Sequence, residues 1–238
     1  MRSEALSVRE RIDALSTYIT PRRLQRIRDV AASRTRRIAV VLEDIDNPFN
    51  ATAVTRTAEG LGIQDVHIIE NEHRFALHEG VTLGAAKWLS MHRYAQRDAD
   101  NTGVCLDQLA RDGFHLVATS PHLDGYTADT LPIDQPVALV FGYEKTGISP
   151  AAARRCTTRL RLPMYGFVES FNITVSAGMA LSRLRERVRT ECDGGGVIDP
   201  GLQEELTLQW ILASIPRRVR DALPEGLVGR VQPGRRVD

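Results

Sequence analysis

The chain has 238 residues and a net charge of only +1, and its 42% hydrophobic and 26% charged residues are ordinary proportions for a globular protein. Its apolar runs are too short to cross a membrane, and its first ten residues show no secretory signal pattern. We therefore expect neither a membrane-spanning nor a secreted protein. The three cysteines are scattered, which predicts a cytoplasmic protein with free or buried thiols and no disulfide framework. The six histidines lack the spacing of metal ligands, so no metal is expected.

The chain opens with helical patterns. Residues 4–34 predict two short helices that break at Thr20-Pro21, because threonine caps a helix and proline suits its first position. Residues 1–36 are therefore expected to form a basic helical extension. Beyond them, short apolar runs alternate with helical segments. The predicted strands are 38–42, 65–69, 114–119, 136–141 and 159–162, and the predicted helices are 50–61, 81–89, 102–112, 149–156 and 172–189.

Alternating strands and helices predict an α/β fold, a parallel sheet with helices on both faces. We assign this domain to residues 37–190. The segment 191–201 contains three consecutive glycines and predicts a flexible break. One or two helices are expected within 202–223, and the last dozen residues look disordered. Residues 191–238 are thus expected to be a linker, short helices and a flexible tail.

Ligands in open α/β sheets bind beyond the carboxyl ends of the strands, and three such ends here are polar or rich in glycine. In the first, Asn50 lies where a helix is expected to start and Arg56 follows six residues later. By themselves these two residues are more typical of a helix-capping asparagine and a surface arginine than of a functional site.

The second polar end runs from Gly142 to Gly147, with Glu144 between the two glycines. Glycines let the backbone approach a ligand closely. Ile148 and Ser149 stand where a phosphate-binding loop needs lysine and serine or threonine, and no dinucleotide-binding glycine pattern follows any strand, so both of those interpretations are excluded. The third end, residues 162–172, is a long loop that leads into a helix lined with small residues.

Together the three segments resemble the SpoU/TrmH family of RNA 2′-O-ribose methyltransferases, a branch of the SPOUT superfamily. Asn50 with Arg56-Thr-Ala matches the first family motif, residues 142–147 match the second, and residues 162–176 match the third. The order is correct and the resemblance covers about residues 22–190. Within the family the chain is most similar to the TrmH enzymes, which act on a guanosine in the D-loop of tRNA.

The resemblance implies a SPOUT-type sheet whose C-terminal part forms a deep trefoil knot, a homodimer, and S-adenosylmethionine (S-adenosyl-L-methionine) as cofactor. A knot departs from the usual rule against threaded chains, and no periodicity predicts it. Carried over by position, the residues implied in cofactor binding are Thr119, Gly142, Leu162, Met164 and Phe171. The residues implied in catalysis are Arg56, Asn50, Glu144, Ser170 and Asn172.

The reaction needs alignment of the ribose oxygen with the methyl group and removal of the hydroxyl proton. The family's activating role falls on Arg56. Arginine normally stays protonated, so Arg56 is either a literal base in a strongly altered site or an electrostatic activator that also clamps the phosphate. Asn50 would orient Arg56 or the ribose, and Glu144 would hold Arg56 or Asn50.

Two departures from the family pattern bear on the substrate. Phe49 replaces a histidine that is common in TrmH enzymes, and it either stacks on a base or marks a different RNA target. Phe171 replaces the usual leucine. The alternatives to a tRNA substrate are ribosomal RNA, another tRNA position, and a non-catalytic RNA-binding protein. The five intact catalytic residues argue against the last.

Charge is unevenly spread along the chain. Residues 1–37 carry a net charge of +6, residues 38–182 carry −6, and the remainder carries +1. A basic arm on an acidic body is the arrangement expected when the arm binds a polyanion such as RNA, although charge alone is as typical of a solvated helix face.

Overall fold

The computed structural model describes residues 6–78, 84–121 and 125–229, which fall into two compact units. The larger unit comprises residues 35–196, and the smaller one combines residues up to 34 with residues from 197 onward. The predicted N-terminal extension, 1–36, and C-terminal segment, 191–238, thus supply the smaller unit, apart from residues 35–36 and 191–196, which belong to the larger unit. No helix among the described residues is long and apolar enough to cross a membrane.

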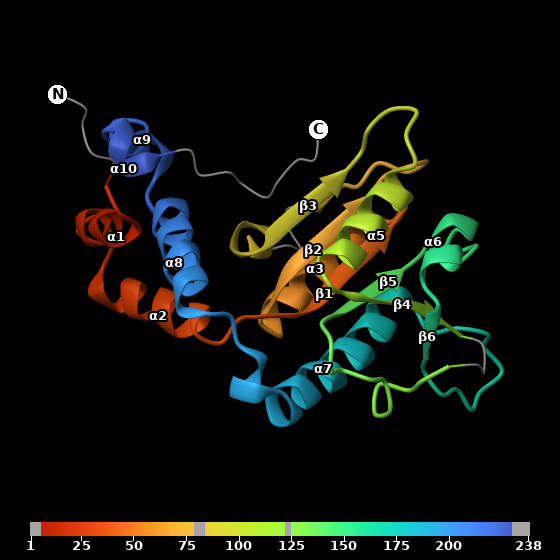
Figure 1. The fold of residues 1–238 in the computed structure, drawn as a ribbon. Coiled ribbons are helices and arrows are strands. Elements are labelled where there is room, and N and C mark those ends of the chain that lie inside the picture. Colours follow the sequence, from red (N-terminus) through yellow and green to blue (C-terminus); the bar gives the residue numbers. More distant parts are fainter. Residues whose placement is uncertain (1–5, 79–83, 122–124, 230–238) are drawn as a thin grey trace. The chain divides into compact units, whose positions relative to one another are not determined.

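The larger unit is built on a six-stranded sheet in which every strand pair is parallel (Figure 1). The strand order is β3-β2-β1-β5-β4-β6, so two neighbouring pairs in the sheet, β1-β5 and β4-β6, are not consecutive in the chain. The strands are β1 (Thr35–Glu43), β2 (Ile63–Ile69), β3 (Ser90–Tyr94), β4 (His115–Ser120), β5 (Val137–Phe141) and β6 (Thr158–Arg161).

Helices cover both faces of this sheet, as predicted. Alternate residues of β1 enter different cores, because side chains of a strand point to opposite faces. Val40 packs in the cluster that contains α3 and α7, whereas Val41 packs in the cluster that contains α5 and α6. The central strands are apolar on both faces for this reason. The helices are α3 (Pro48–Gly60), α5 (Asn101–Arg111), α6 (Pro150–Arg155) and α7 (Ile173–Glu191), with short 3₁₀ turns η1 (Ala85–Trp88) and η2 (Asp193–Gly196).

Most predicted elements are confirmed, and one is wrong. A helix was expected over 81–89, but the described part of this segment forms only a single 3₁₀ turn, η1. Residues 81–83 lie outside the described residues. The η1 turn leads into β3, an edge strand that the sequence did not predict. The residues of β3 are all polar or half-buried apart from Tyr94, so the strand lacks the apolar run by which buried strands are recognised.

The smaller unit is helical. Thr20 caps α2 and Pro21 begins it, as predicted. The buried Arg34 guanidinium lies 5.1 Å from the centre of the Trp210 ring, and Arg11 donates to the carbonyls of Leu227 and Val228. Arginines of the basic arm therefore hold this unit together. Its helices are α1 (Val8–Ser16), α2 (Pro21–Ala31), α8 (Pro200–Ser214), α9 (Arg217–Arg220) and α10 (Glu225–Val228).

A buried polar cluster lies under the edge strand of the sheet. The rings of His67 and His92 stack at 4.4 Å, His92 lies 2.8 Å from a carboxylate oxygen of Asp65, and Arg36 contacts the same carboxylate. Burial lowers the pKa of His67 to about 3, and the neighbouring charges of His92 and Arg36 act in the same direction. His67 is therefore neutral in the folded protein at any pH near neutrality.

We expect the stability of the protein to fall as the pH is lowered from 7 to 5, partly because of His67. Its folded pKa is below the unfolded value, so only the unfolded state takes up this proton between about pH 6.5 and 3. The contribution lost by pH 5 is about 2 kcal/mol. Chemical denaturation at both pH values should show that His67→Phe loses less stability than the parent on acidification. An equal loss in both proteins would contradict this role.

Candidate active site

Three predicted cofactor-binding residues meet at one edge of the sheet. Strands β5, β4 and β6 are parallel neighbours, so their carboxyl ends lie side by side. Thr119 lies near the end of β4, and its hydroxyl donates to the Val140 carbonyl of β5 at 2.9 Å. Gly142 follows β5 directly and Leu162 follows β6 directly. These three residues thus converge although up to 43 residues separate them along the chain.

The loop of residues 142–149 closes tightly on itself. The Gly147 amide donates to the Tyr143 carbonyl at 2.8 Å, and Gly147 has a left-handed φ of 74°. A Cβ atom on Gly142 would overlap the backbone of Gly147 and Ile148. Both glycines are therefore required by the path of the backbone at this edge.

The loop of residues 162–172 carries the remaining predicted cofactor residues. Leu162 packs on the core beneath the sheet edge, and Met164 and Phe171 are half-buried. Tyr165 and Phe167 are almost fully exposed in the same loop. Apolar side chains of this kind suit contact with the apolar parts of a bound ligand.

A chain of side-chain amides joins the three motifs. The Asn172 amide donates to the Asn50 carbonyl oxygen at 3.4 Å, and the Asn50 amide donates to Glu144 at 2.7 Å. Asn172 also caps α7 by accepting from the Thr174 backbone amide. These contacts bring together α3, the 142–149 loop and the start of α7, as the motif order implied.

The structure corrects the expected cap of α3. The side chain that caps this helix is Asn47, which accepts from the Phe49 amide at 3.0 Å. Asn50 lies within the first turn, and its amide is used for Glu144 instead. This matters for function because a capping asparagine uses its side-chain oxygen for the backbone, whereas the Asn50 oxygen accepts from Asn172.

Arg56 and Ser170 are not brought into this chain of contacts. Both are exposed, and neither forms a hydrogen bond or ion pair with another residue in the described part of the chain. Arg56 is six residues beyond Asn50 on α3, which turns it about 120° around the helix from Asn50. The expected contact of Glu144 is therefore with Asn50 and not with Arg56.

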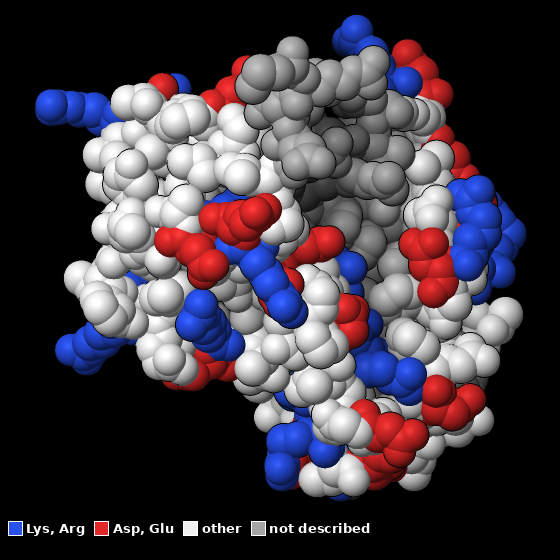
Figure 2. Space-filling model, turned by 60° about the vertical axis from the view of Figure 1, so that its left-hand side comes forward, with Lys and Arg blue, Asp and Glu red and all other residues white. Residues whose placement is uncertain are grey.

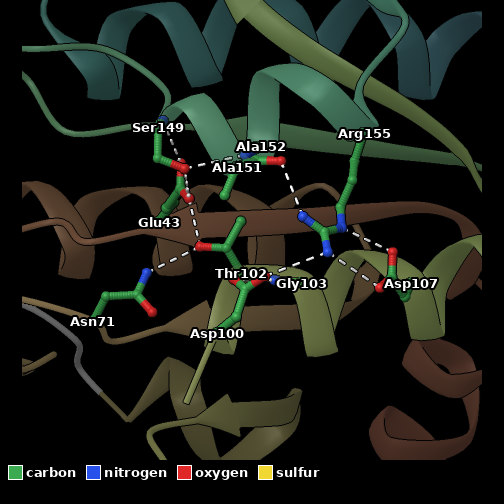
Figure 3. Close-up of polar contacts among 10 residues, drawn as sticks. All are labelled: Glu43, Asn71, Asp100, Thr102, Gly103, Asp107, Ser149, Ala151, Ala152 and Arg155. Carbon is green, nitrogen blue, oxygen red and sulfur yellow. Dashed lines mark hydrogen bonds and ion pairs between the residues drawn. The ribbon is translucent and has the colours of Figure 1, made fainter. Parts of the chain in front are cut away.

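Behind this edge lies a buried carboxylate that the sequence analysis missed (Figure 3). Glu43, the last residue of β1, is only 2% exposed. One of its oxygens accepts from the hydroxyls of Thr102 and Ser149 at 2.6 and 2.7 Å, and the other accepts from the Ser149 backbone amide at 2.9 Å. Both hydroxyls themselves accept hydrogen bonds, from the Asn71 side chain and the Ala152 amide. Each hydroxyl must therefore donate its single proton to Glu43.

Next to it, Asp44 anchors the segment that follows β2. One of its carboxylate oxygens accepts from the backbone amides of Asn71, Glu72 and His73. Its φ of 52° is left-handed, which aspartate tolerates better than most residues. Two acidic residues directly after an apolar strand were the signal in the sequence. Their partners could not be identified there, because they come from three other parts of the chain.

Glu43→Gln is expected to loosen the 142–149 loop. The amide NH₂ of glutamine is a donor and would face a hydroxyl or amide that also donates, so at least one buried hydrogen bond is lost. We expect the free energy of unfolding to fall by about 2 kcal/mol. S-adenosylmethionine should bind several-fold more weakly, because Ser149 ends the loop. Thermal unfolding and calorimetric titration measure the two effects.

Asp107→Asn is the matched control in the same region. Asp107 accepts from Arg155 at 2.8 Å but is exposed (Figure 3), and an exposed ion pair contributes little. This variant should change stability by less than about 1 kcal/mol and leave cofactor binding intact. Equal effects of the two substitutions would show that Glu43 does not position the loop.

The family model that matches the chain decides its family. The model of the SpoU rRNA Methylase family matches residues 37–182, more than half of the chain and nearly all of the larger unit. The chain belongs to this family. Asn50, Glu144, Asn172 and the 142–149 loop all lie within the matched residues.

Relatives within the family carry names that specify a substrate. The chain is 37% identical over 182 residues to a tRNA (guanosine(18)-2'-O)-methyltransferase of Borreliella burgdorferi, covering 76% of this chain and 81% of that protein. It is 28% identical to a protein of the same name from Aquifex aeolicus, with 79% and 85% coverage. It is also 30% identical to a Pseudomonas aeruginosa 23S rRNA (guanosine-2'-O-)-methyltransferase, over 65% of this chain and 61% of that protein.

Solved structures show the same fold. The TrmH/SpoU tRNA modifying enzyme of A. aeolicus superposes with a TM-score of 0.71 at 24% identity, over 82% of this chain and 98% of the other. The SpoU methyltransferase AviRb of Streptomyces viridochromogenes, solved with its cofactor AdoMet, superposes with a TM-score of 0.54 at 22% identity, covering 67% and 61%.

Proposed function

We propose that this protein transfers a methyl group from S-adenosylmethionine to a ribose 2′-hydroxyl of RNA, and that its substrate is guanosine 18 in the D-loop of tRNA. The observation that carries the reaction is the chain of contacts from Asn172 through Asn50 to Glu144, beside the glycine loop at the same sheet edge. The names of the Borreliella and Aquifex relatives support the tRNA substrate.

The residues at the edge fit this cofactor. The closed 142–149 loop offers backbone groups, and half-buried Leu162, Met164 and Phe171 offer apolar surface. The cofactor supplies a methyl group already activated by the sulfonium charge. Asn50 has its amide orientation set by Asn172 and Glu144, so it is suited to orient the ribose.

Arg56 is proposed to activate the 2′-oxygen and to bind the substrate phosphate. It has no ion-pair partner among the described residues, so a phosphate would provide its counter-charge. Ser170 is proposed to line the same site from the loop that precedes α7. The alternative is that Arg56 acts as a literal base, and Arg56→Lys separates the two roles.

The knot and the homodimer are part of the same proposal. Strand β6 lies between β4 and Tyr126, because the Tyr126 amide donates to the Arg159 carbonyl and the Arg161 amide donates to the Tyr126 carbonyl. This pairing of β6 with earlier segments on both of its sides supports a C-terminal part that threads past them. The exposed apolar side chains of Val175 and Met179 on α7 support a dimer through that helix. A tRNA substrate and unpaired thiols favour the cytoplasm.

The proposal is tested by mapping the methylated nucleotide. Purified protein is incubated with labelled S-adenosylmethionine and unmodified total RNA, and 2′-O-methylation is located by sequencing with and without the protein. Label at guanosine 18 of tRNA is the expected result. Label in ribosomal RNA would contradict the tRNA substrate and would favour ribosomal RNA, the substrate in the name of the Pseudomonas relative. Cofactor binding without label in any RNA would leave only an RNA-binding protein.

The basic arm is expected to contribute to RNA binding through α2. Arg22 and Arg26 are exposed one turn apart on this helix and form no ion pair with another described residue. Figure 2 shows acidic side chains beside basic ones on the face that it draws. For RNA binding, arginines without an acidic partner therefore matter more than the net charge of a whole segment. The double variant Arg22→Ala with Arg26→Ala should flatten the slope of log affinity against log salt by about 1.5.

Arg9→Ala is the matched control, since Arg9 already pairs with Glu204 at 2.7 Å. It should change the salt slope less than the double variant does. An unchanged slope in the double variant would mean that this face of α2 is only solvated. Point substitution is preferable to deletion of residues 1–36, because deletion would also remove Arg34 from the Trp210 ring and unfold the smaller unit.

A further inference from the structure

Two exposed aromatic rings lie beside the polar contacts of the candidate active site. Phe49, directly before Asn50, stacks on His78 with the ring centres 4.6 Å apart and the planes 24° from parallel. Phe49 remains 55% exposed and belongs to neither hydrophobic core. This large ring is therefore not held by core packing.

Both rings are held by the start of α3. The Phe49 amide donates to the Asn47 side chain at 3.0 Å, and the His78 amide donates to the Thr52 hydroxyl at 2.8 Å. Thr52 is itself fully buried. The stacked pair is thus attached by two backbone hydrogen bonds to the helix that carries Asn50, which fixes its position relative to the candidate ribose site.

A second aromatic pair flanks the other side of the same contact. Tyr143, directly before Glu144, lies 4.8 Å from the ring of His73. His73 is anchored through its amide to Asp44. Asn50 and Glu144 are therefore each preceded in the chain by an aromatic residue. Each of these two aromatic rings contacts a histidine of the 71–78 segment.

We propose that the Phe49–His78 pair is a stacking platform for a nucleobase of the RNA substrate, at or next to the nucleotide whose ribose lies at Asn50. This inference rests on the proposed function. Proteins recognise RNA mainly through unstacked bases laid on aromatic side chains, and such stacking tolerates any base because every base has a π-face. Phe49 has one face on His78 and most of its surface free, which is the geometry that a base requires.

A double-mutant cycle between protein and RNA tests the stacking. The protein change is Phe49→Leu, which keeps apolar bulk and removes the ring face. The RNA change is an abasic ribose placed at the methylated nucleotide or at either neighbour, in a transcript of the RNA that the mapping experiment identifies. Dissociation constants are measured by fluorescence anisotropy for all pairs.

Phe49→Leu should weaken binding of the intact RNA about tenfold. On the abasic RNA that lacks the stacked base, the same substitution should cost less than twofold. Phe49→Trp should retain the coupling, because it retains the ring face. Val104→Ala removes exposed apolar surface on α5, away from the site, and should change neither constant.

Two outcomes would overturn the inference. The first is an equal loss on the intact RNA and on all three abasic RNAs. The second is a changed oligomeric state in Phe49→Leu, which would show that the exposed face of the ring packs against a second copy of the chain. Failure of the proposed function is separate, since the parent protein would then methylate no RNA.

Discussion

Arg56→Ala is expected to reduce methyl transfer by at least a hundredfold while S-adenosylmethionine binds within about twofold of the parent affinity. Removing one group that stabilises developing charge typically costs 10²–10³ in rate. Cofactor binding is spared because Arg56 is exposed on α3 and contacts none of Thr119, Gly142 and Leu162. Single-turnover methylation and calorimetric titration give the two quantities.

Arg56→Lys separates the two roles left open for this residue. Lysine keeps the positive charge but loses the planar fork that binds phosphate through two hydrogen bonds. An electrostatic activator should retain part of its rate in this variant, with weaker RNA binding. A literal base should instead show a pH profile that moves with the replacement. Arg154→Ala, an exposed arginine on α6, is the control and should leave both quantities intact. A large loss of cofactor affinity in Arg56→Ala would contradict the proposed role.

Gly142→Ala is expected to abolish measurable cofactor binding in a protein that still folds. The added Cβ would overlap the backbone of Gly147 and Ile148, and neither is a flexible side chain that could move aside. The 142–149 loop must therefore open, and with it the backbone groups that follow β5. We expect the dissociation constant for S-adenosylmethionine to rise at least a hundredfold, measured by calorimetric titration.

Gly166→Ala is the matched control in the other loop of the edge. A Cβ atom there would meet no other atom within 4 Å, and Gly166 has no left-handed φ. This variant should bind the cofactor within a few-fold of the parent. If Gly142→Ala also bound normally, the 142–149 loop would not be part of the cofactor site. Circular dichroism of both variants checks that the larger unit is folded.

The partners of the first-motif residue Asn50 depend on the tertiary structure. Asn50 was selected from its motif, but the sequence left open whether it orients Arg56 or the ribose, and whether Glu144 holds Arg56 or Asn50. A hydrogen bond at 2.7 Å across 94 residues depends on which strands are neighbours. That order, β1 beside β5, is a property of the folded sheet.

The burial of Glu43 and the strand β3 are two features that local sequence patterns did not predict. Glu43 ends a strand that was predicted, but its burial and its three donors come from α5 and α6. β3 has no apolar run because it is an edge strand over a polar cluster of Asp65 and His92. In both cases the surroundings, and not the segment itself, determine the structure.

The amino-acid sequence by itself determined the α/β class, the cap at Thr20, the three motifs and their order, because periodicity, capping and glycine placement act over a few residues. Only the tertiary structure decided that Asn172, Asn50 and Glu144 touch, that Arg56 does not join them, and that Phe49 stacks on His78. These contacts arise from the strand order, and that order is set when helices on both faces bury the sheet.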